Sequence, residues 1–189
     1  MRLINYRPAI VALVGHPKAG KTTAAEILKN LYGYQIVDTG APLRKISMKY
    51  LGLDRDMVYT QKGKASRVMI AGKEWQVRDI LGTLGAKLEE MFGEEIMPIM
   101  SHNMVGPDSL IVDPSCRKTQ GHYWKRQGGV VIKIDNPAVG PSPYAFDKFD
   151  ESSVDHTILN DGLARELSEA DAMADLERKI HRLFSSLGK

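Results

Sequence analysis

The feature that most constrains the fold is a glycine-bounded loop between an apolar strand and an amphipathic helix. Residues 9–14 read Ala-Ile-Val-Ala-Leu-Val, an apolar run bounded by Pro8 and Gly15, which is typical of a strand buried on both faces of a parallel sheet. Residues 21–32 then place apolar side chains at helical spacing, and Gly33 follows where such a helix ends. A strand, a tight turn and a helix in this order predict the first unit of an α/β fold.

The loop has a spacing that carries chemistry. Residues 15–22 read Gly-His-Pro-Lys-Ala-Gly-Lys-Thr, which is GxxxxGK[ST]. Glycines let such a loop wrap around phosphate groups with its N–H groups pointing inward, and the following helix adds its positive N-terminal end. Lys21 then supplies a charge to the β- and γ-phosphates, and the Thr22 hydroxyl ligates Mg²⁺. The pattern predicts a nucleoside triphosphate site made of Gly15, His16, Pro17, Lys18, Ala19, Gly20, Lys21, Thr22 and Thr23.

A carboxylate ends a second apolar strand. Asp113 closes the run Leu-Ile-Val-Asp at residues 110–113, the position from which an aspartate of a P-loop protein holds the metal or its water. Taken alone, an aspartate followed by Pro114 is equally consistent with a turn cap. Together with the glycine loop, the metal role is favoured, and we predict Thr22 and Asp113 as the metal ligands.

Strands and helices alternate along the rest of the chain, which predicts a parallel sheet. We expect strands at residues 9–14, 34–37, 110–113, 130–134 and 155–159. We expect helices at 21–32, 42–51, 77–92, 95–104 and 163–187, with short helices or an insert in the polar stretch 54–73. The predicted fold class is α/β, a P-loop NTPase fold with a parallel five-stranded sheet flanked by helices.

Composition excludes several classes of protein. A single cysteine, Cys116, rules out an intramolecular disulfide framework and a cysteine-rich zinc site, and suits a reducing cytoplasm. The net charge is only +3 and the sequence has no block of Lys or Arg, so we expect no nucleic-acid partner. No apolar run approaches the length of a membrane span and no targeting segment is evident, which predicts a cytoplasmic protein without a membrane partner.

Three further segments carry a resemblance to a known family. Residues 39–44, Thr-Gly-Ala-Pro-Leu-Arg, resemble the TGxxLR segment of adenylate-kinase-like nucleoside monophosphate kinases. Residues 77–85 resemble an Arg-x-Leu-Leu-x-x-Leu-Gly segment of bacteriophage deoxynucleoside monophosphate kinases. The blocks 111–113, 127–134 and 155–162 resemble segments of the same enzymes in the same order. The chain is thus similar to bacteriophage-type deoxynucleoside monophosphate kinases from Ile10 to about Leu167.

This resemblance implies transfer of the γ-phosphate of ATP to a deoxynucleoside 5′-monophosphate, with Mg²⁺ as cofactor. It implies that Lys21 stabilises the transferring charge while Thr22 and Asp113 serve the metal. It also implies substrate-binding roles for three residues: Arg44 and Arg78 would clamp the acceptor phosphate, and Thr39 would contact the acceptor nucleotide. The deoxynucleoside monophosphate is the expected small-molecule partner, and the host cytoplasm is the expected location if a phage encodes the chain.

The domain organisation follows from the same resemblance. We expect one P-loop kinase domain over residues 1–189, with the core at about 8–40, 108–135 and 154–189. A helical acceptor-binding insert is expected at about 41–107 and a short lid loop at about 136–153. The long final helix offers a surface through which a homodimer could form.

The sequence departs from the family in two places. Asp113 is followed by Pro-Ser-Cys-Arg, whereas the family has an arginine two positions after the aspartate, so we predict that Arg117 takes that catalytic role. The lid segment 136–153 contains Lys148 and no arginine, whereas lid arginines normally offset charge on the transferring phosphate. Two alternatives therefore stay open: a P-loop kinase of another small acceptor such as dephospho-coenzyme A, and a nucleotide-binding protein without catalysis. A GTPase switch is disfavoured because no Asn-Lys-x-Asp motif occurs.

Overall fold

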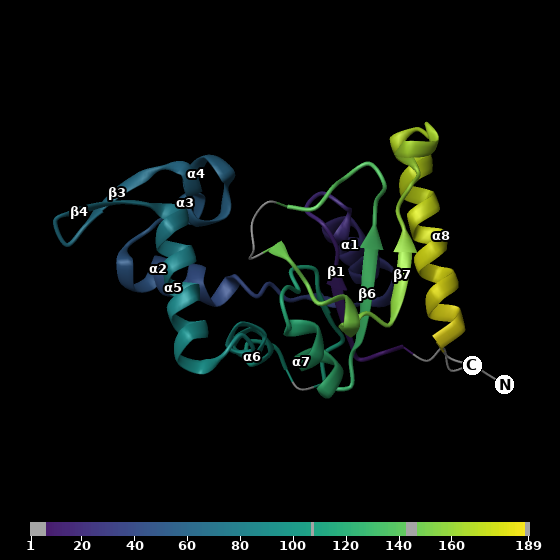
Figure 1. Cartoon of the computed structure of the whole chain (residues 1–189), viewed down its shortest axis with the longest axis horizontal. Helices are drawn as coiled ribbons and strands as arrows, with labels where there is room; N and C mark the ends of the chain where they lie inside the picture. The colour runs from purple at the N-terminus through teal and green to yellow at the C-terminus, as the bar shows by residue number, and fades with distance from the viewer. Residues whose placement is uncertain (1–6, 107, 143–146, 188–189) are drawn as a thin grey trace. The chain divides into compact units, whose positions relative to one another are not determined.

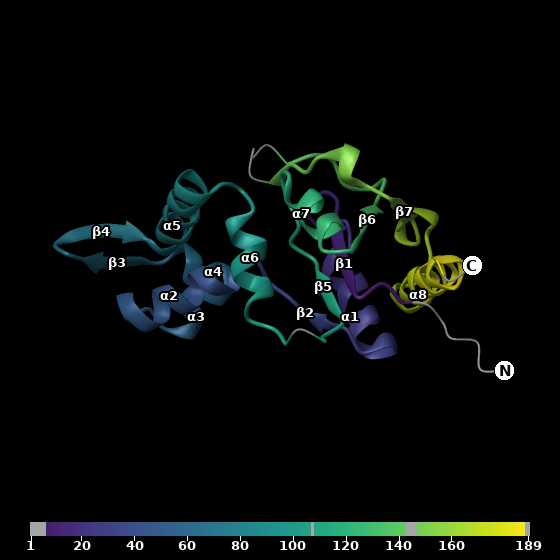
Figure 2. The same ribbon diagram turned by 90° about the horizontal axis from the view of Figure 1, so that it is seen from below.

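The structure is a computed structural model that describes residues 7–106, 108–142 and 147–187. By its internal contacts the chain forms two compact units. The first unit contains the residues up to Asp38 and those from Val105 onwards, and the second unit is Thr39–Met104. Figures 1 and 2 label the elements of both units.

The first unit is built on a parallel sheet of five strands in the order β2-β5-β1-β6-β7. All neighbouring strands of this sheet pair in parallel. The strands are β1 (Ile10–Val14), β2 (Gln35–Ile36), β5 (Ile111–Asp113), β6 (Val130–Asp135) and β7 (His156–Leu159). The predicted α/β fold with a five-stranded parallel sheet is confirmed.

Helices cover both faces of this sheet, as Figure 2 shows: α1 (Lys21–Tyr32) and α8 (Glu169–Leu187) lie on one face, and α7 (Gln120–Arg126) lies on the other. Every residue of β1 is consequently buried, which explains why that strand is apolar without alternation. The register pairs Ala12 of β1 with Asp113 of β5, so Asp113 lies at the carboxyl end of the sheet next to the strand that leads into the loop.

The first helix has the predicted bounds, whereas the last one does not. Gly33 adopts a left-handed φ of 77° and ends α1 where the sequence predicts. The single helix expected over 163–187 is interrupted, because Glu166 also adopts a left-handed conformation after a short 3₁₀ turn, η3 (Leu163–Arg165). The Ser168 hydroxyl then accepts a hydrogen bond from the Asp171 N–H and starts α8. Among the described residues, no helix combines the length and apolar character of a membrane span.

The second unit packs helices around a small apolar cluster of Leu53, Val58, Val77 and Ile80. Its elements are α2 (Ala41–Leu51), α3 (Arg55–Tyr59), α4 (Gln61–Ala65), β3 (Arg67–Ile70), β4 (Lys73–Gln76), α5 (Val77–Phe92) and α6 (Ile96–His102).

The β3–β4 hairpin corrects the expectation of an all-helical insert. Its turn residues Ala71 and Gly72 both have positive φ, 50° and 75°, as a two-residue hairpin turn requires. Ala-Gly is not the Asn-Gly or Asp-Gly signature by which such turns are recognised in sequence. The alternation of exposed and half-buried residues over 67–70 is also too short to stand out.

Gly15 provides a test of how tightly the loop after β1 is packed. It has a φ of 136°, and a Cβ at this position would lie 2.3 Å from the carbonyl oxygen of Ile134. Gly33 also has positive φ, but a Cβ there would meet no atom within 4 Å. We expect Gly15→Ala to lower the free energy of unfolding by about 3 kcal/mol or more and Gly33→Ala by about 1–2 kcal/mol, measured by urea denaturation. Equal losses in the two variants would contradict the close approach.

Candidate functional site

The loop between β1 and α1 is held from two sides. Gly15 and Gly20 have φ values of 136° and 105°, and Lys18 also has a positive φ of 67°. Asn160, which follows β7, donates its side-chain N–H to the Ala19 carbonyl oxygen at 2.9 Å. A Cβ on Gly20 would lie 2.4 Å from the same Asn160 nitrogen, so the second glycine is needed for this contact. Sequence reasoning included Asn160 in the family resemblance but assigned it no role.

The start of α1 is suited to an anion. Gly20 is the N-cap residue, no side chain caps the helix, and its first turn contains no acidic residue. The positive end of the helix is therefore not neutralised by a carboxylate of its own. Thr22 lies in this first turn with an exposed side chain.

Lys21 folds back over the loop. Its Nζ donates to the carbonyl oxygens of Gly15 at 2.7 Å and of His16 at 2.9 Å. Burial lowers the pKa of Lys21, the charge of Arg117 lowers it further, and the charge of Asp147 opposes both. Lys21 and Arg117 thus share one electrostatic environment, although they lie 96 positions apart in the sequence.

Asp113 is fully buried and held by three hydrogen bonds. One carboxylate oxygen accepts from the Ser115 N–H and hydroxyl, both at 2.8 Å, and the other accepts from the indole N–H of Trp124 at 2.9 Å. Burial raises the pKa of Asp113 to about 6, and these hydrogen bonds act in the opposite direction. The contact between Trp124 and Asp113 was not predicted from the sequence, because the two residues meet only when α7 packs on the sheet.

The metal prediction can be compared with this geometry. Among the described residues, no group of three or more His, Cys, Asp or Glu side chains could hold a metal ion. A magnesium ion in a P-loop site needs fewer protein ligands, because phosphate oxygens and waters supply the rest. The exposed Thr22 fits a direct ligand of Mg²⁺. Asp113 is fully buried, and its contact with the ion through a water stays a prediction.

Arg117 is positioned by a segment of the expected lid. Its guanidinium lies 3.6 Å from a carboxylate oxygen of Asp147. The next residue, Lys118, has a positive φ of 46° and exchanges backbone hydrogen bonds with Lys148 at 2.6 Å and Asp150 at 2.9 Å. Part of the loop predicted at 136–153 is therefore fixed beside Arg117; residues 143–146 of that loop lie outside the described residues.

The predicted acceptor residues all lie in the second unit. Thr39 and Arg44 are 6% and 9% exposed, and the carbon of the Arg44 guanidinium lies 4.7 Å from the ring centroid of Tyr59. Arg78, in the first turn of α5, is exposed and donates to the side-chain oxygen of Gln61 at 2.8 Å. Arg44 and Arg78 thus each contact one end of the three-residue segment 59–61.

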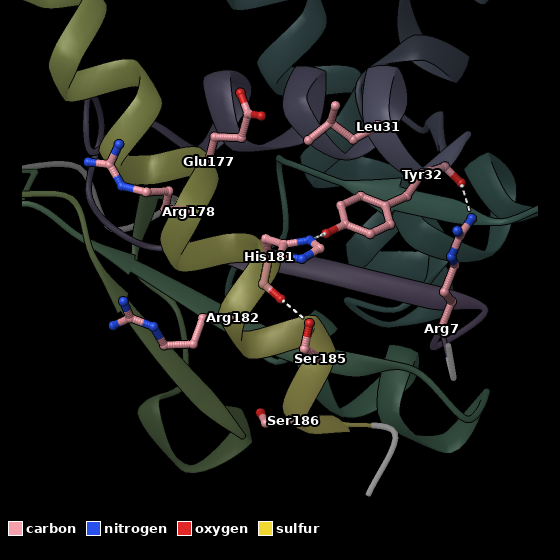
Figure 3. Close-up of a pocket in the computed structure, with 9 residues that line it drawn as sticks. All are labelled: Arg7, Leu31, Tyr32, Glu177, Arg178, His181, Arg182, Ser185 and Ser186. Atoms are coloured by element: carbon pink, nitrogen blue, oxygen red, sulfur yellow. Dashed lines mark hydrogen bonds between the residues drawn. The ribbon is translucent and has the colours of Figure 1, made fainter. Parts of the chain in front are cut away.

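A surface groove elsewhere in the first unit contains none of these residues. It has a volume of about 970 Å³, lies between the end of α1 and α8, and is shown in Figure 3. The Tyr32 hydroxyl and His181 Nδ1 meet in it at 2.8 Å. Arg178 and Arg182 point away from Tyr32 and Arg7, so the cations around the groove do not converge.

The fold and the loop define the class of the protein. A parallel sheet of order β2-β5-β1-β6-β7, with GxxxxGK[ST] between β1 and α1, is a P-loop NTPase fold. The crystal structure of TT1252 from Thermus thermophilus shares this fold with a TM-score of 0.53. The two chains are 15% identical, and the match covers 96% of this chain and 99% of that one.

Two known proteins to which the chain is similar in sequence are named as kinases of nucleotides. The chain is 27% identical over 149 residues to a protein of Acanthamoeba polyphaga mimivirus named "Putative deoxynucleotide monophosphate kinase", covering 69% of this chain and 75% of that protein. It is 44% identical over 48 residues to a cytidylate kinase of Chlorobaculum tepidum. That match covers 25% of this chain and spans about a fifth of the cytidylate kinase. No family model matches. The resemblance to bacteriophage enzymes in particular stays a prediction.

The Trp124 contact leads to a prediction about stability. Trp124→Phe removes the indole donor and leaves the buried Asp113 carboxylate with one partner fewer. We expect a loss of about 2–3 kcal/mol in urea denaturation at pH 8 in EDTA. The substitution should raise the pKa of Asp113 above its wild-type value of about 6, so the loss should be larger at pH 8 than at pH 5, where both proteins are mostly protonated at Asp113. Trp75→Phe, a change in the second unit, is the control, and its loss of stability should not depend on pH in this way. The same pH dependence in both variants would refute the hydrogen bond between Trp124 and Asp113 as the cause.

Proposed function

We propose that this chain transfers the γ-phosphate of ATP to a deoxynucleoside 5′-monophosphate, forming the diphosphate and ADP in a Mg²⁺-dependent reaction. The single observation that carries the proposal is the loop of residues 15–22 with Lys21 folded over it, together with the buried carboxylate of Asp113 on the strand beside β1. The mimivirus relative, similar over 69% of this chain, supports a nucleotide acceptor.

In the proposed reaction, the loop and the start of α1 hold the phosphates of ATP. Lys21 exchanges its two carbonyl acceptors for phosphate oxygens, and these are better partners because they are charged. Lys21 is partly buried, which lowers its pKa and also strengthens the interaction of its ammonium group with an anion. Arg117, whose charge acts on Lys21, offsets negative charge as the phosphoryl group moves.

Thr22 and Asp113 would hold the metal, Thr22 directly and Asp113 through a water. Mg²⁺, when bound, supplies positive charge to the β- and γ-phosphates. Asp113 is kept in one orientation by Ser115 and Trp124, so its effect on the metal site depends on those two residues as well.

Arg44 and Arg78 would bind the acceptor phosphate and Thr39 the acceptor nucleotide. A guanidinium presents a planar fork that matches two phosphate oxygens, which fixes the direction of the phosphate as well as its position. No general base is required of the protein, because phosphoryl transfer depends mainly on positioning and charge stabilisation.

A nucleotide-binding protein without catalysis is the second candidate. It is favoured by the composition of the expected lid, residues 136–153, which contains one lysine, Lys148, and no arginine. A kinase of a different small acceptor, such as dephospho-coenzyme A, would use the same loop. It would differ in the acceptor that stimulates ADP formation.

ADP formation from MgATP tests the proposal directly. We expect one or more of the four common deoxynucleoside monophosphates to raise the rate of ADP formation. The rates with their ribose counterparts and without any acceptor serve as the comparison. Lys21→Ala should reduce the stimulated rate by at least about a hundredfold while the circular dichroism spectrum is unchanged. ADP formation that ignores the acceptor would indicate an ATPase, and ATP binding without turnover would indicate the non-catalytic protein.

Arg78→Ala tests the acceptor site separately. It removes a cation that donates only to Gln61 among the described contacts, so the fold should be retained. We expect the KM for the acceptor to rise by about tenfold or more while the KM for ATP changes less than twofold. Lys87→Ala, which removes an exposed cation from the same helix, should change neither value. A larger effect on ATP than on the acceptor would reject the assignment.

A further inference from the structure

The corner between α3 and α4 gathers three arginines from three helices. This corner, residues 59–61, is called the Tyr59 corner below. The guanidinium carbons of Arg44 from α2 and Arg55 from α3 lie 4.7 Å and 4.8 Å from the ring centroid of Tyr59. Arg78 from α5 donates to Gln61 at the other end of the corner. Neither Arg55 nor Tyr59 is among the acceptor residues predicted from the sequence.

In the part of the chain that the structure describes, neither Arg55 nor Arg78 forms an ion pair with a carboxylate, and both residues are exposed. By contrast, Arg67 on the hairpin of the same unit pairs with Glu74 at 2.6 Å. Asp54, the acidic residue that precedes Arg55, is used as a helix cap and accepts from the Met57 N–H.

Like charges gathered in this way repel one another, and an anion removes the repulsion. The Tyr59 ring holds the cations of Arg44 and Arg55 through cation–π contacts, which do not take up the guanidinium N–H groups as a carboxylate would. The donors of Arg55 therefore stay available to a ligand. Tyr59 is 40% exposed, so solvent reaches the ring on which the guanidinium groups rest.

We propose that Arg55 is a third phosphate-binding arginine of the acceptor site and that Tyr59 is a positioning residue that holds Arg55 and Arg44 toward the same anion. The inference rests on the proposed function for its assignment of Arg44 and Arg78 to the acceptor. It adds to the proposed function the chemical group that the Tyr59 corner recognises, which is a terminal phosphate dianion. Three guanidinium forks match its three oxygens and two charges, whereas a carboxylate offers two oxygens and one charge.

Binding of orthophosphate tests Arg55 without reference to turnover. The full chain carrying Lys21→Ala, which removes the ammonium group of the loop, is titrated with orthophosphate and with acetate at constant ionic strength by calorimetry. We expect phosphate to bind at least about tenfold more tightly than acetate, and Arg55→Ala to weaken phosphate binding about ten- to a hundredfold.

Lys49→Ala is the matched control. Lys49 is also an exposed cation resting on a tyrosine of the second unit, 5.2 Å from the ring centroid of Tyr50, but it lies outside the Tyr59 corner. Its removal should change phosphate affinity less than twofold. Equal effects of Arg55→Ala and Lys49→Ala would overturn the assignment of Arg55, and equal affinity for acetate and phosphate would overturn the substrate class.

Tyr59 is tested by separating its ring from its hydroxyl. Tyr59→Phe keeps the ring that holds the guanidinium groups, so the KM for the acceptor should stay within about twofold of wild type. Tyr59→Leu removes the ring and should raise that KM about tenfold, with kcat and the KM for ATP changed less than twofold. Tyr50→Leu makes the same change at another exposed tyrosine of this unit and should have no effect. Equal acceptor KM values for Tyr59→Leu and Tyr50→Leu, with melting temperatures preserved, would remove Tyr59 from the site.

The two proposals fail in different ways. If no monophosphate stimulates ADP formation, the proposed function fails, while the orthophosphate titration still decides whether the Tyr59 corner binds phosphate. If a deoxynucleoside monophosphate is phosphorylated but Arg55→Ala retains wild-type phosphate affinity and acceptor KM, the proposed function stands and the inference about Arg55 fails.

Discussion

The loop after β1 can lie where it does only because two of its residues have no side chain. A Cβ on Gly15 would collide with the backbone of β6, and one on Gly20 would collide with Asn160. These close approaches fix the direction in which α1 leaves the sheet, and with it the uncapped helix start, the Thr22 hydroxyl and the Lys21 ammonium group. The chemistry proposed for the first unit therefore depends on packing between backbones more than on any one charged side chain.

Much of this arrangement could be predicted because its signals are local. The apolar run of β1, the loop spacing and the glycine at position 33 each occupy a few consecutive residues, and the bounds of α1 and α5 follow from helical periodicity. The contacts that were missed join residues far apart in sequence or depend on backbone conformation. Trp124 meets Asp113 only across the packed sheet, and Glu166 breaks a helical pattern through a left-handed conformation that glutamate rarely adopts.

Each unit gathers positive charge at one place although the net charge of the chain is only +3. In the first unit, the charge of Arg117 acts on Lys21, and the Asp147 carboxylate offsets it only in part. In the second unit, arginines meet at the Tyr59 corner and rest on an aromatic ring. The proposed reaction requires such local concentrations of cations, because the negative charges of its two anionic substrates repel each other and have to be offset.

The burial of Trp124 has a practical consequence. The chain contains two tryptophans, Trp75 in the second unit and Trp124 in the first. The Trp124 indole is shielded from water and bonded to a carboxylate, whereas Trp75 is half-buried beneath the ammonium group of Lys73. Their fluorescence emission should therefore differ in wavelength and in sensitivity to soluble quenchers. Each unit carries an optical reporter of its own, with which ligand binding to either one can be followed without attaching a dye.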